Sequence, residues 1–119
     1  MGDPVADGSG LECSVEHTGD RVVIAVTGEL DLATVDDFAA AVEAQLPDGP
    51  VLVDLSGLSF MDSSGVRILD TLLREVDRQG WTLTIASELQ PGVRQVLEMT
   101  GMLAGLPIEG GAPPAGPDR

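Results

Sequence analysis

Apolar and polar residues alternate along the first part of the chain in the pattern of β-strands. Residues 11–15 alternate in this way and predict a half-buried strand, and the apolar-rich run 21–27 predicts a second strand. The residues between them, 18–20, are Thr-Gly-Asp, which indicates a turn. The first two strands are therefore expected to pair as a hairpin.

A short apolar run at 51–55, broken only by Asp54, predicts a strand buried inside a sheet. Leu58, Phe60 and Met61 are expected to continue inward through a connecting segment. The polar residues that follow, 62–65, stand where the spacing of apolar residues becomes helical.

Three segments place their apolar residues every three or four positions, which is the spacing of an amphipathic helix. Thr34 with Asp37 predicts a capping box at the first helix, and Asp62 is the expected N-cap of the second. The predicted buried faces are Val35, Phe38, Val42 and Leu46; then Val66, Leu69, Leu72, Leu73 and Val76; then Val93, Val96 and Leu97.

Further strands are predicted at 81–85, where apolar and threonine residues alternate, and at 106–108. Strands that alternate with helices give parallel neighbours. We predict one α/β domain at 11–108, with a mixed, mostly parallel sheet of four to five strands and helices mainly on one face. The Gly- and Pro-rich ends are expected to form a disordered segment at 1–10 and a flexible tail at 109–119.

The composition argues against several classes of partner and site. The net charge is −14, and all six basic residues are arginine, so nucleic acid and anionic membrane surfaces are poor partners. A single His and a single Cys exclude a zinc site made of these residues alone, although a carboxylate-only magnesium site stays open. No cofactor is predicted.

The chain shows no predicted membrane anchor or leader. No apolar run approaches the roughly 20 residues that span a bilayer, and residues 1–10 lack the features of a signal peptide. One cysteine cannot form an internal disulfide, which fits a reducing compartment. A cytoplasmic location is therefore expected.

The segment Asp62-Ser63-Ser64-Gly65 is the main candidate for a functional site. A strand delivers it to the first turn of a helix, where free N–H groups and the positive end of the helix dipole favour a phosphate, bound or covalently attached. The four residues alone also predict a plain helix cap, and Asp31 fits the start of a helix as well as a functional role.

Three stretches carry a resemblance to a known family: TGELD at 27–31, VDL and SFMDSSG within 53–65, and the run 92–101 that ends in MTG. With them the chain resembles STAS domains, and specifically the stand-alone bacterial anti-sigma factor antagonists, over about residues 11–108. The resemblance implies a regulator without catalytic activity of its own.

The resemblance also implies a cycle of partner switching. The unphosphorylated protein would bind an anti-sigma factor that is also a serine kinase, and so free the sigma factor. That kinase would use ATP to phosphorylate the first serine of the motif, which ends binding, and a PPM-type serine phosphatase would restore it.

Carried over by position, the phosphate acceptor is Ser63. Asp31 and Asp62 match the acidic residues that flank this serine in the family, and Ser64 and Gly65 complete the motif. Arg67 departs from the pattern, because relatives usually have a small residue there. Its guanidinium would either pair with a phosphate on Ser63 or reach the partner.

Two alternatives from other classes remain at this point. A phosphate- or nucleotide-binding module or enzyme would use Asp31, Asp62 and Ser63, although a serine nucleophile needs a base and the only His lies in the hairpin turn. A STAS scaffold in a larger regulatory assembly is the other alternative.

Overall fold

The computed structural model describes residues 10–109, which form a five-stranded sheet and three α-helices. Apart from Gly10 and Glu109, the predicted disordered segment and tail lie outside the described residues. The elements are β1 (Leu11–Thr18), β2 (Arg21–Leu30), α1 (Val35–Gln45), η1 (Leu46–Asp48), β3 (Val51–Met61), α2 (Ser63–Gln79), β4 (Leu83–Ala86), α3 (Pro91–Met99), η2 (Leu103–Gly105) and β5 (Ile108–Glu109).

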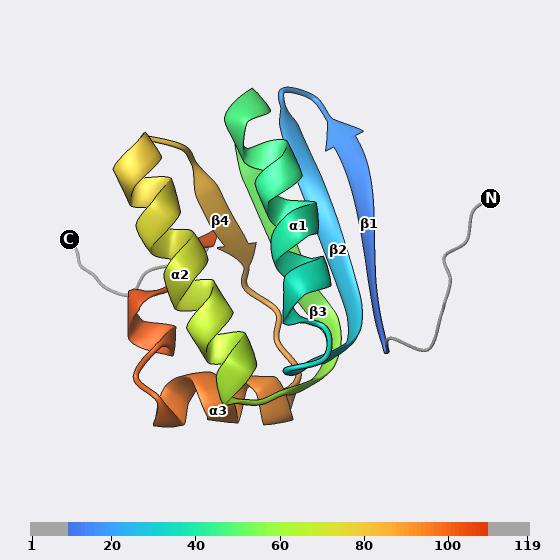
Figure 1. Cartoon of the computed structure of the whole chain (residues 1–119), viewed down its shortest axis with the longest axis vertical. Helices are drawn as coiled ribbons and strands as arrows, with labels where there is room; N and C mark the ends of the chain where they lie inside the picture. The colour runs from blue at the N-terminus through green and yellow to red at the C-terminus, as the bar shows by residue number, and fades with distance from the viewer. Residues whose placement is uncertain (1–9, 110–119) are drawn as a thin grey trace.

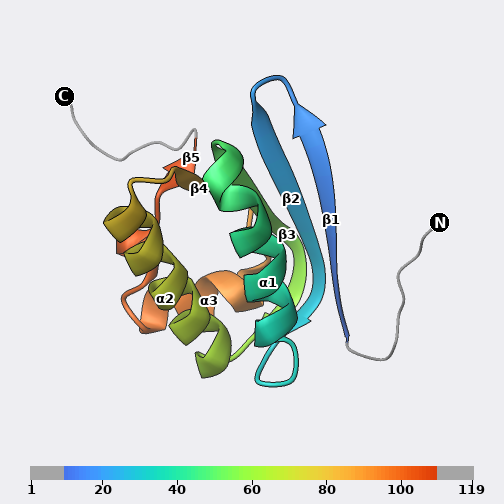
Figure 2. The same ribbon diagram turned by 45° about the horizontal axis from the view of Figure 1, so that its top comes forward.

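The strands lie side by side in the order β1-β2-β3-β4-β5. β1 and β2 form the predicted antiparallel hairpin, and every later neighbouring pair is parallel. Figures 1 and 2 show α1 and α2 side by side over the same face of the sheet, with α3 across the end toward which β2, β3 and β4 run. The predicted fold class is therefore confirmed.

The main core fills the space between the sheet and the helices. Alternate residues of β2 and β3 face it in register, so that Val22 pairs with Val51 and Ile24 with Val53. Each such side chain contributes about 1.5–3 kcal/mol when it is fully buried. The largest side chains that are fully buried include Phe38, Ile24, Leu30, Leu46, Leu55, Leu58, Met61, Leu69, Leu72, Ile85 and Leu97.

β2 and β3 are both longer than the sequence pattern predicts. β2 runs on to Leu30, and β3 continues to Met61 without a separate connecting segment. The pairing between them shifts register near Gly57, where an added Cβ would lie 2.6 Å from Thr27 Cγ2. Such an irregularity interrupts the alternation of inward- and outward-facing residues along a strand. The sequence pattern therefore predicts shorter strands than the structure has.

The prediction that Phe60 faces inward is wrong. Its side chain is 46% exposed, whereas both Leu58 and Met61 are buried. After the register shift, two residues separate the core-facing Leu58 and Met61, and Phe60 falls on the outer side.

None of the helices within residues 10–109 combines the length and the apolar character that crossing a membrane requires.

The close approach of β1 to β2 at Gly28 gives a first testable prediction. Gly28 has φ +106°, and an added Cβ would lie 2.0 Å from the carbonyl oxygen of Gly10. Gly28→Ala should therefore lower the free energy of unfolding by at least about 3 kcal/mol, because a left-handed residue alone costs about 1–2 kcal/mol. Urea unfolding measures the loss.

Gly19→Ala is the matched control for this substitution. Gly19 also has a positive φ, +63°, but an added Cβ there meets nothing within 4 Å. Its loss should stay near about 1–2 kcal/mol. If both variants lost the same free energy of unfolding, the close contact with Gly10 would not contribute to the effect of Gly28→Ala.

Candidate functional site

The ends of β2 and β3 bring two acidic residues together. Leu30 pairs with Met61 in register, so Asp31 and Asp62 are the next residues on neighbouring parallel strands. The backbone N–H of Asp62 also donates a hydrogen bond to the carbonyl oxygen of Leu30, at 3.3 Å. The β2–α1 loop and the start of α2 therefore lie against each other.

Asp62 is the N-cap of α2, as predicted. Its backbone is extended, and its Oδ1 accepts a hydrogen bond from the backbone N–H of Ser64 at 2.9 Å. Its carbonyl oxygen accepts from Gly65 and Val66 at 3.0 and 3.2 Å. The side-chain bond satisfies the N–H group of Ser64, which has no partner inside the helix, and the carbonyl oxygen accepts the first helical bond.

Ser63 is the first residue of α2, and its side chain is exposed. No other residue from 10 to 109 makes a hydrogen bond with its hydroxyl group. Ser64 differs, since it is half-buried and its backbone N–H is engaged by Asp62. The two serines of the motif therefore have different environments, and the first is the accessible one.

Gly65 lets α2 begin close to the ends of β2 and β3. An added Cβ at this buried position would lie 2.7 Å from Met61 Cγ and 3.1 Å from two side-chain carbons of Leu30. A larger residue would push the first turn of α2 away from both strands. Gly65 thus determines how closely the first turn of α2, which includes Ser63, packs on the core.

The β2–α1 loop is closed by Thr34, and the predicted capping box is wrong. Thr34 makes no side-chain cap bond. Its buried hydroxyl donates to the carbonyl oxygen of Glu29 at 2.9 Å and accepts from the backbone N–H of Asp31 at 3.0 Å. The hydroxyl turns back toward the strand because Thr34 is buried there and its hydroxyl needs hydrogen-bond partners.

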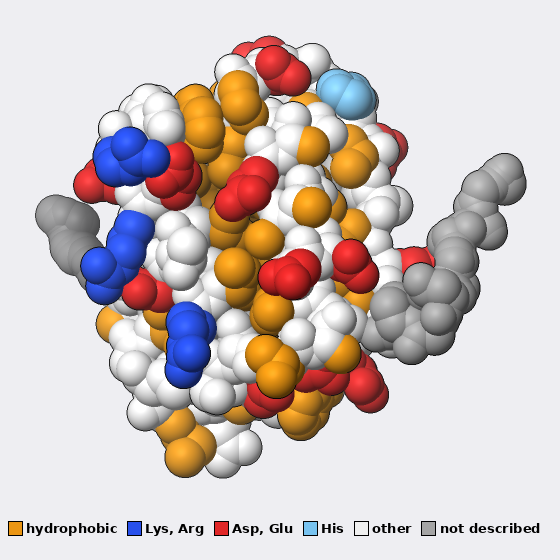
Figure 3. All heavy atoms as spheres, viewed as in Figure 1, with side chains coloured by type: hydrophobic (Ala, Val, Ile, Leu, Met, Phe, Trp, Pro, Cys, Tyr) orange, Lys and Arg blue, Asp and Glu red, His pale blue; other side chains and the backbone are white. Residues whose placement is uncertain are grey.

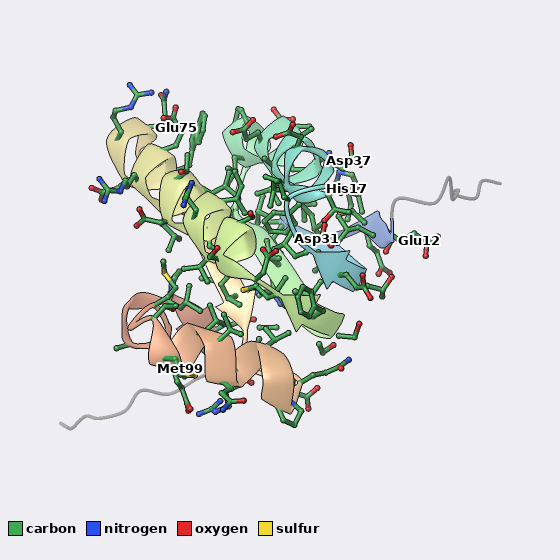
Figure 4. The ribbon with its side chains drawn as sticks, turned by 60° about the horizontal axis from the view of Figure 1, so that its bottom comes forward. Glu12, His17, Asp31, Asp37, Glu75 and Met99 are labelled. Carbon is green, nitrogen blue, oxygen red and sulfur yellow. The ribbon has the colours of Figure 1, made fainter. Side chains whose placement is uncertain are left out.

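The carboxylate of Asp31 also has a local partner. Its Oδ1 accepts a hydrogen bond from the backbone N–H of Ala33 at 3.0 Å, which is an Asx-type turn. Figure 4 looks onto this end of the molecule and shows Asp31 on one side of the start of α2 and Met99 of α3 on another. Asp31 therefore has a structural role in addition to any electrostatic one.

Exposed apolar side chains occur on the same loops and on α3. Leu32 is 78% exposed directly after Asp31, Phe60 precedes the end of β3, and Met99 is 77% exposed near the end of α3. Leu32 was not predicted as a functional residue, although it lies in the β2–α1 loop, outside the apolar face of α1. A patch of exposed apolar residues is typical of a protein-binding surface, and these three residues are the candidates for one here.

Among the described residues, Arg67 is the one arginine without a carboxylate partner. The other four form ion pairs, namely Arg21 with Glu109, Arg74 with Asp70, Arg78 with Glu75 and Arg94 with Glu98. Figure 3 shows arginine side chains in a column along the outer face of α2. Arg74 and Asp70 are four residues apart on α2 and pair at 2.9 Å.

The remaining polar candidates lie away from this end or are inert. Within residues 10–109 no group of three His, Cys, Asp or Glu is arranged to hold a metal ion. Cys13 is half-buried, and burial, with a smaller effect of Asp37, raises the pKa of its thiol. His17 pairs with Val22 at the opposite end of β2 from Leu30, which is roughly 25 Å along the strand.

The packing at Gly65 gives a second prediction. Gly65→Ala should destabilise the protein by about 1–3 kcal/mol, because the new methyl group overlaps Met61 and Leu30 in a packed region. Gly92→Ala is the control. It lies in α3 with nothing within 4 Å of an added Cβ, so it should be neutral or stabilising by up to about 1 kcal/mol. Chemical unfolding distinguishes them, and a neutral Gly65→Ala would contradict the packing argument.

The hydrogen bonds of Thr34 give a third prediction. Thr34→Val removes the hydroxyl and leaves two part-buried backbone groups without this partner, so the free energy of unfolding should fall by about 1–3 kcal/mol. Thr34→Ser keeps the hydroxyl and should recover most of that loss. Equal losses for Val and Ser would show that the methyl group, and not the hydroxyl, stabilises the loop.

The chain is similar to known proteins over most of its length. A family model described as "Mlab, STAS domain" matches residues 13–107. An anti-sigma F factor antagonist of Lysinibacillus sphaericus is 36% identical over 88 residues, which are 71% of this chain and 74% of that protein.

Solved structures give the same result. An anti-sigma factor antagonist from Mycobacterium paratuberculosis has a TM-score of 0.74 at 23% identity, covering 90% of this chain and 92% of that one, which is a likeness of fold. Unphosphorylated SpoIIAA gives a TM-score of 0.65 at 26% identity, with 82% and 85% covered. SpoIIAA of Bacillus in its phosphorylated form gives 0.59 at 26% identity, with 82% and 88% covered. Since the family model covers most of its length, this chain belongs to the STAS domain family.

Proposed function

We propose that this protein is an anti-sigma factor antagonist controlled by phosphorylation of Ser63. The unphosphorylated form binds an anti-sigma factor that is also a serine kinase, and this binding frees a sigma factor. The kinase then transfers a phosphoryl group to Ser63 and binding ends, until a PPM-type serine phosphatase removes the phosphate. The names of the relatives and the two phosphorylation states of SpoIIAA support this proposal.

The observation that carries the proposal is the state of the Ser63 side chain. It is exposed at the first residue of α2, and its hydroxyl makes no hydrogen bond with any other residue from 10 to 109. A kinase can therefore reach the Oγ atom without breaking a contact of the folded protein. Transfer of the γ-phosphoryl group from ATP forms the Oγ–P bond and releases ADP and the hydroxyl proton.

The surroundings of Ser63 explain how a phosphate would end binding. The phosphate adds about −1.5 to −2 charges next to Asp62 and close to the Asp31 loop. We infer that the partner covers Leu32, Phe60 and Met99, so that this charge would have to be desolvated at the interface. A hundredfold loss of affinity needs only about 2.7 kcal/mol, which an unpaired charge in an interface readily supplies.

The enzyme alternative has little in its favour. A serine nucleophile needs a neighbouring base, and the single His lies at the opposite end of β2 from Leu30. The carboxylate Oδ1 atoms of Asp31 and Asp62 are engaged by backbone N–H groups. These residues therefore hold the loops around Ser63, which remains the substrate of another protein's chemistry.

The fourth prediction tests the switch directly. Kinase and ATP should place one phosphate on Ser63, which mass spectrometry locates. The affinity of the phosphorylated protein for the anti-sigma factor should then be at least about a hundredfold lower than that of the unmodified protein, or 2.7 kcal/mol. Isothermal titration calorimetry with the anti-sigma factor measures the change. Ser63→Asp should weaken binding by a smaller factor, because a carboxylate carries less charge than phosphate.

Ser63→Ala and Ser64→Ala are the controls. Ser63→Ala should bind the partner and accept no phosphate, whereas Ser64→Ala should still be phosphorylated. If phosphorylated protein and Ser63→Ala bound the partner equally well, the proposed switch would be wrong. If the isolated protein sedimented as a large oligomer and bound no anti-sigma factor, the scaffold alternative would replace it.

A further inference from the structure

Arg67 is the described arginine whose charge is not used inside the fold. The other described arginines each lie within 3.2 Å of a carboxylate oxygen. Arg67 is exposed and makes no ion pair or hydrogen bond with the residues from 10 to 109. An unpaired cation stands out in a protein with a net charge of −14, because carboxylates are abundant.

Arg67 lies one helical turn after Ser63. α2 is continuous from Ser63 to Gln79, so the two residues are four apart on the same helix. Side chains at this spacing are neighbours, with their Cβ atoms about 5–6 Å apart. An acidic group placed N-terminal to a basic group is the more favourable order for such a pair.

Asp62 at the N-cap is the acidic residue at the start of α2, and the first turn that follows it contains none. α1 has Asp36 and Asp37 in its first turn, whereas the first turn of α2 has no acidic residue. Arg67 instead places a positive charge close to the positive end of the helix dipole. A phosphate on Ser63 would correct this arrangement and give the guanidinium a partner.

The other charged groups on the surrounding elements do not compete for this role. The carboxylates repel a phosphate, and the arginine on α3 already pairs with a glutamate at 3.2 Å. These groups are Asp62 at the N-cap, Glu29 and Asp31 on β2 and its loop, Asp36 and Asp37 on α1, Asp70 on α2, and Arg94 and Glu98 on α3.

We propose that Arg67 is the internal counter-ion of the phosphate on Ser63, so that the phosphorylated protein is held by an ion pair along the first turn of α2. This inference rests on the proposed function, because it takes Ser63 to be the modified residue. Phosphorylation would then have two effects on the surface. An anion appears at Ser63, and Arg67, the described arginine without an ion pair, turns toward it. A partner that meets Arg67 in the unmodified protein loses that contact at the same moment.

The fifth prediction uses the pKa of the phosphate group itself. The full-length protein is made with phosphoserine incorporated at position 63 during translation, so that no kinase is needed. ³¹P NMR then follows the second ionisation, whose pKa is about 6 in an isolated phosphoserine. Because Arg67 favours the dianion, Arg67→Gln should raise this pKa by about 0.15–0.4 pH unit, the equivalent of about 0.2–0.5 kcal/mol for such a pair.

Two variants and one condition control this titration. Arg67→Lys keeps the charge and should recover most of the shift. Arg78→Gln removes an exposed arginine that lies about 22 Å from Ser63 along the axis of α2, and it should leave the phosphate pKa unchanged. In 1 M salt, where screening extends over only about 3 Å, the difference between Arg67→Gln and the parent should shrink.

An identical phosphate pKa in the parent and in Arg67→Gln would overturn the inference, even if phosphorylation still ended partner binding. The reverse outcome separates the two proposals as well. If the phosphate pKa depended on Arg67 but phosphorylated protein bound the partner as tightly as unmodified protein, the ion pair would stand and the proposed switch would fall.

Discussion

The pairing of Leu30 with Met61 determines the geometry of the end of the sheet where Ser63 lies. Each of these residues is buried at the end of a parallel strand. A polar loop follows Leu30, and the start of α2 follows Met61. The hydrogen bond from Asp62 N–H to the Leu30 carbonyl oxygen holds the two exits together. Gly65 then allows α2 to pack on both side chains. A surface serine is thus positioned by packed apolar side chains, and its location does not depend on a flexible loop.

The structural and the electrostatic roles of the two aspartates are compatible. Asp62 caps α2 through one oxygen, and Asp31 closes its turn through one oxygen. The same residues can therefore hold the site in shape and oppose a second negative group there. A choice between helix cap and functional residue, which the sequence pattern poses, is not required by the geometry.

Predictability from sequence followed the range of the interactions involved. The hairpin, the three helices and the Asp62 cap were predicted because each depends on residues a few positions apart. Phe60 was misplaced because a register shift between two strands, a long-range feature, reverses the expected alternation. Thr34 was misassigned because the partner of its hydroxyl, the Glu29 carbonyl oxygen, is defined by the path of the loop and not by the helix that follows.

The acidic character of the protein places a limit on how a phosphate can act. Full ionisation changes the net charge from −14 only to about −16, which is a small change in the long-range field. At physiological ionic strength, exposed charges more than about 8 Å apart are largely screened from each other. The effect of one phosphate must therefore be local, at the contact itself. In the proposed switch, the position of Ser63 at the partner contact therefore matters more than the net charge of the protein, because only there would binding have to remove the phosphate from water.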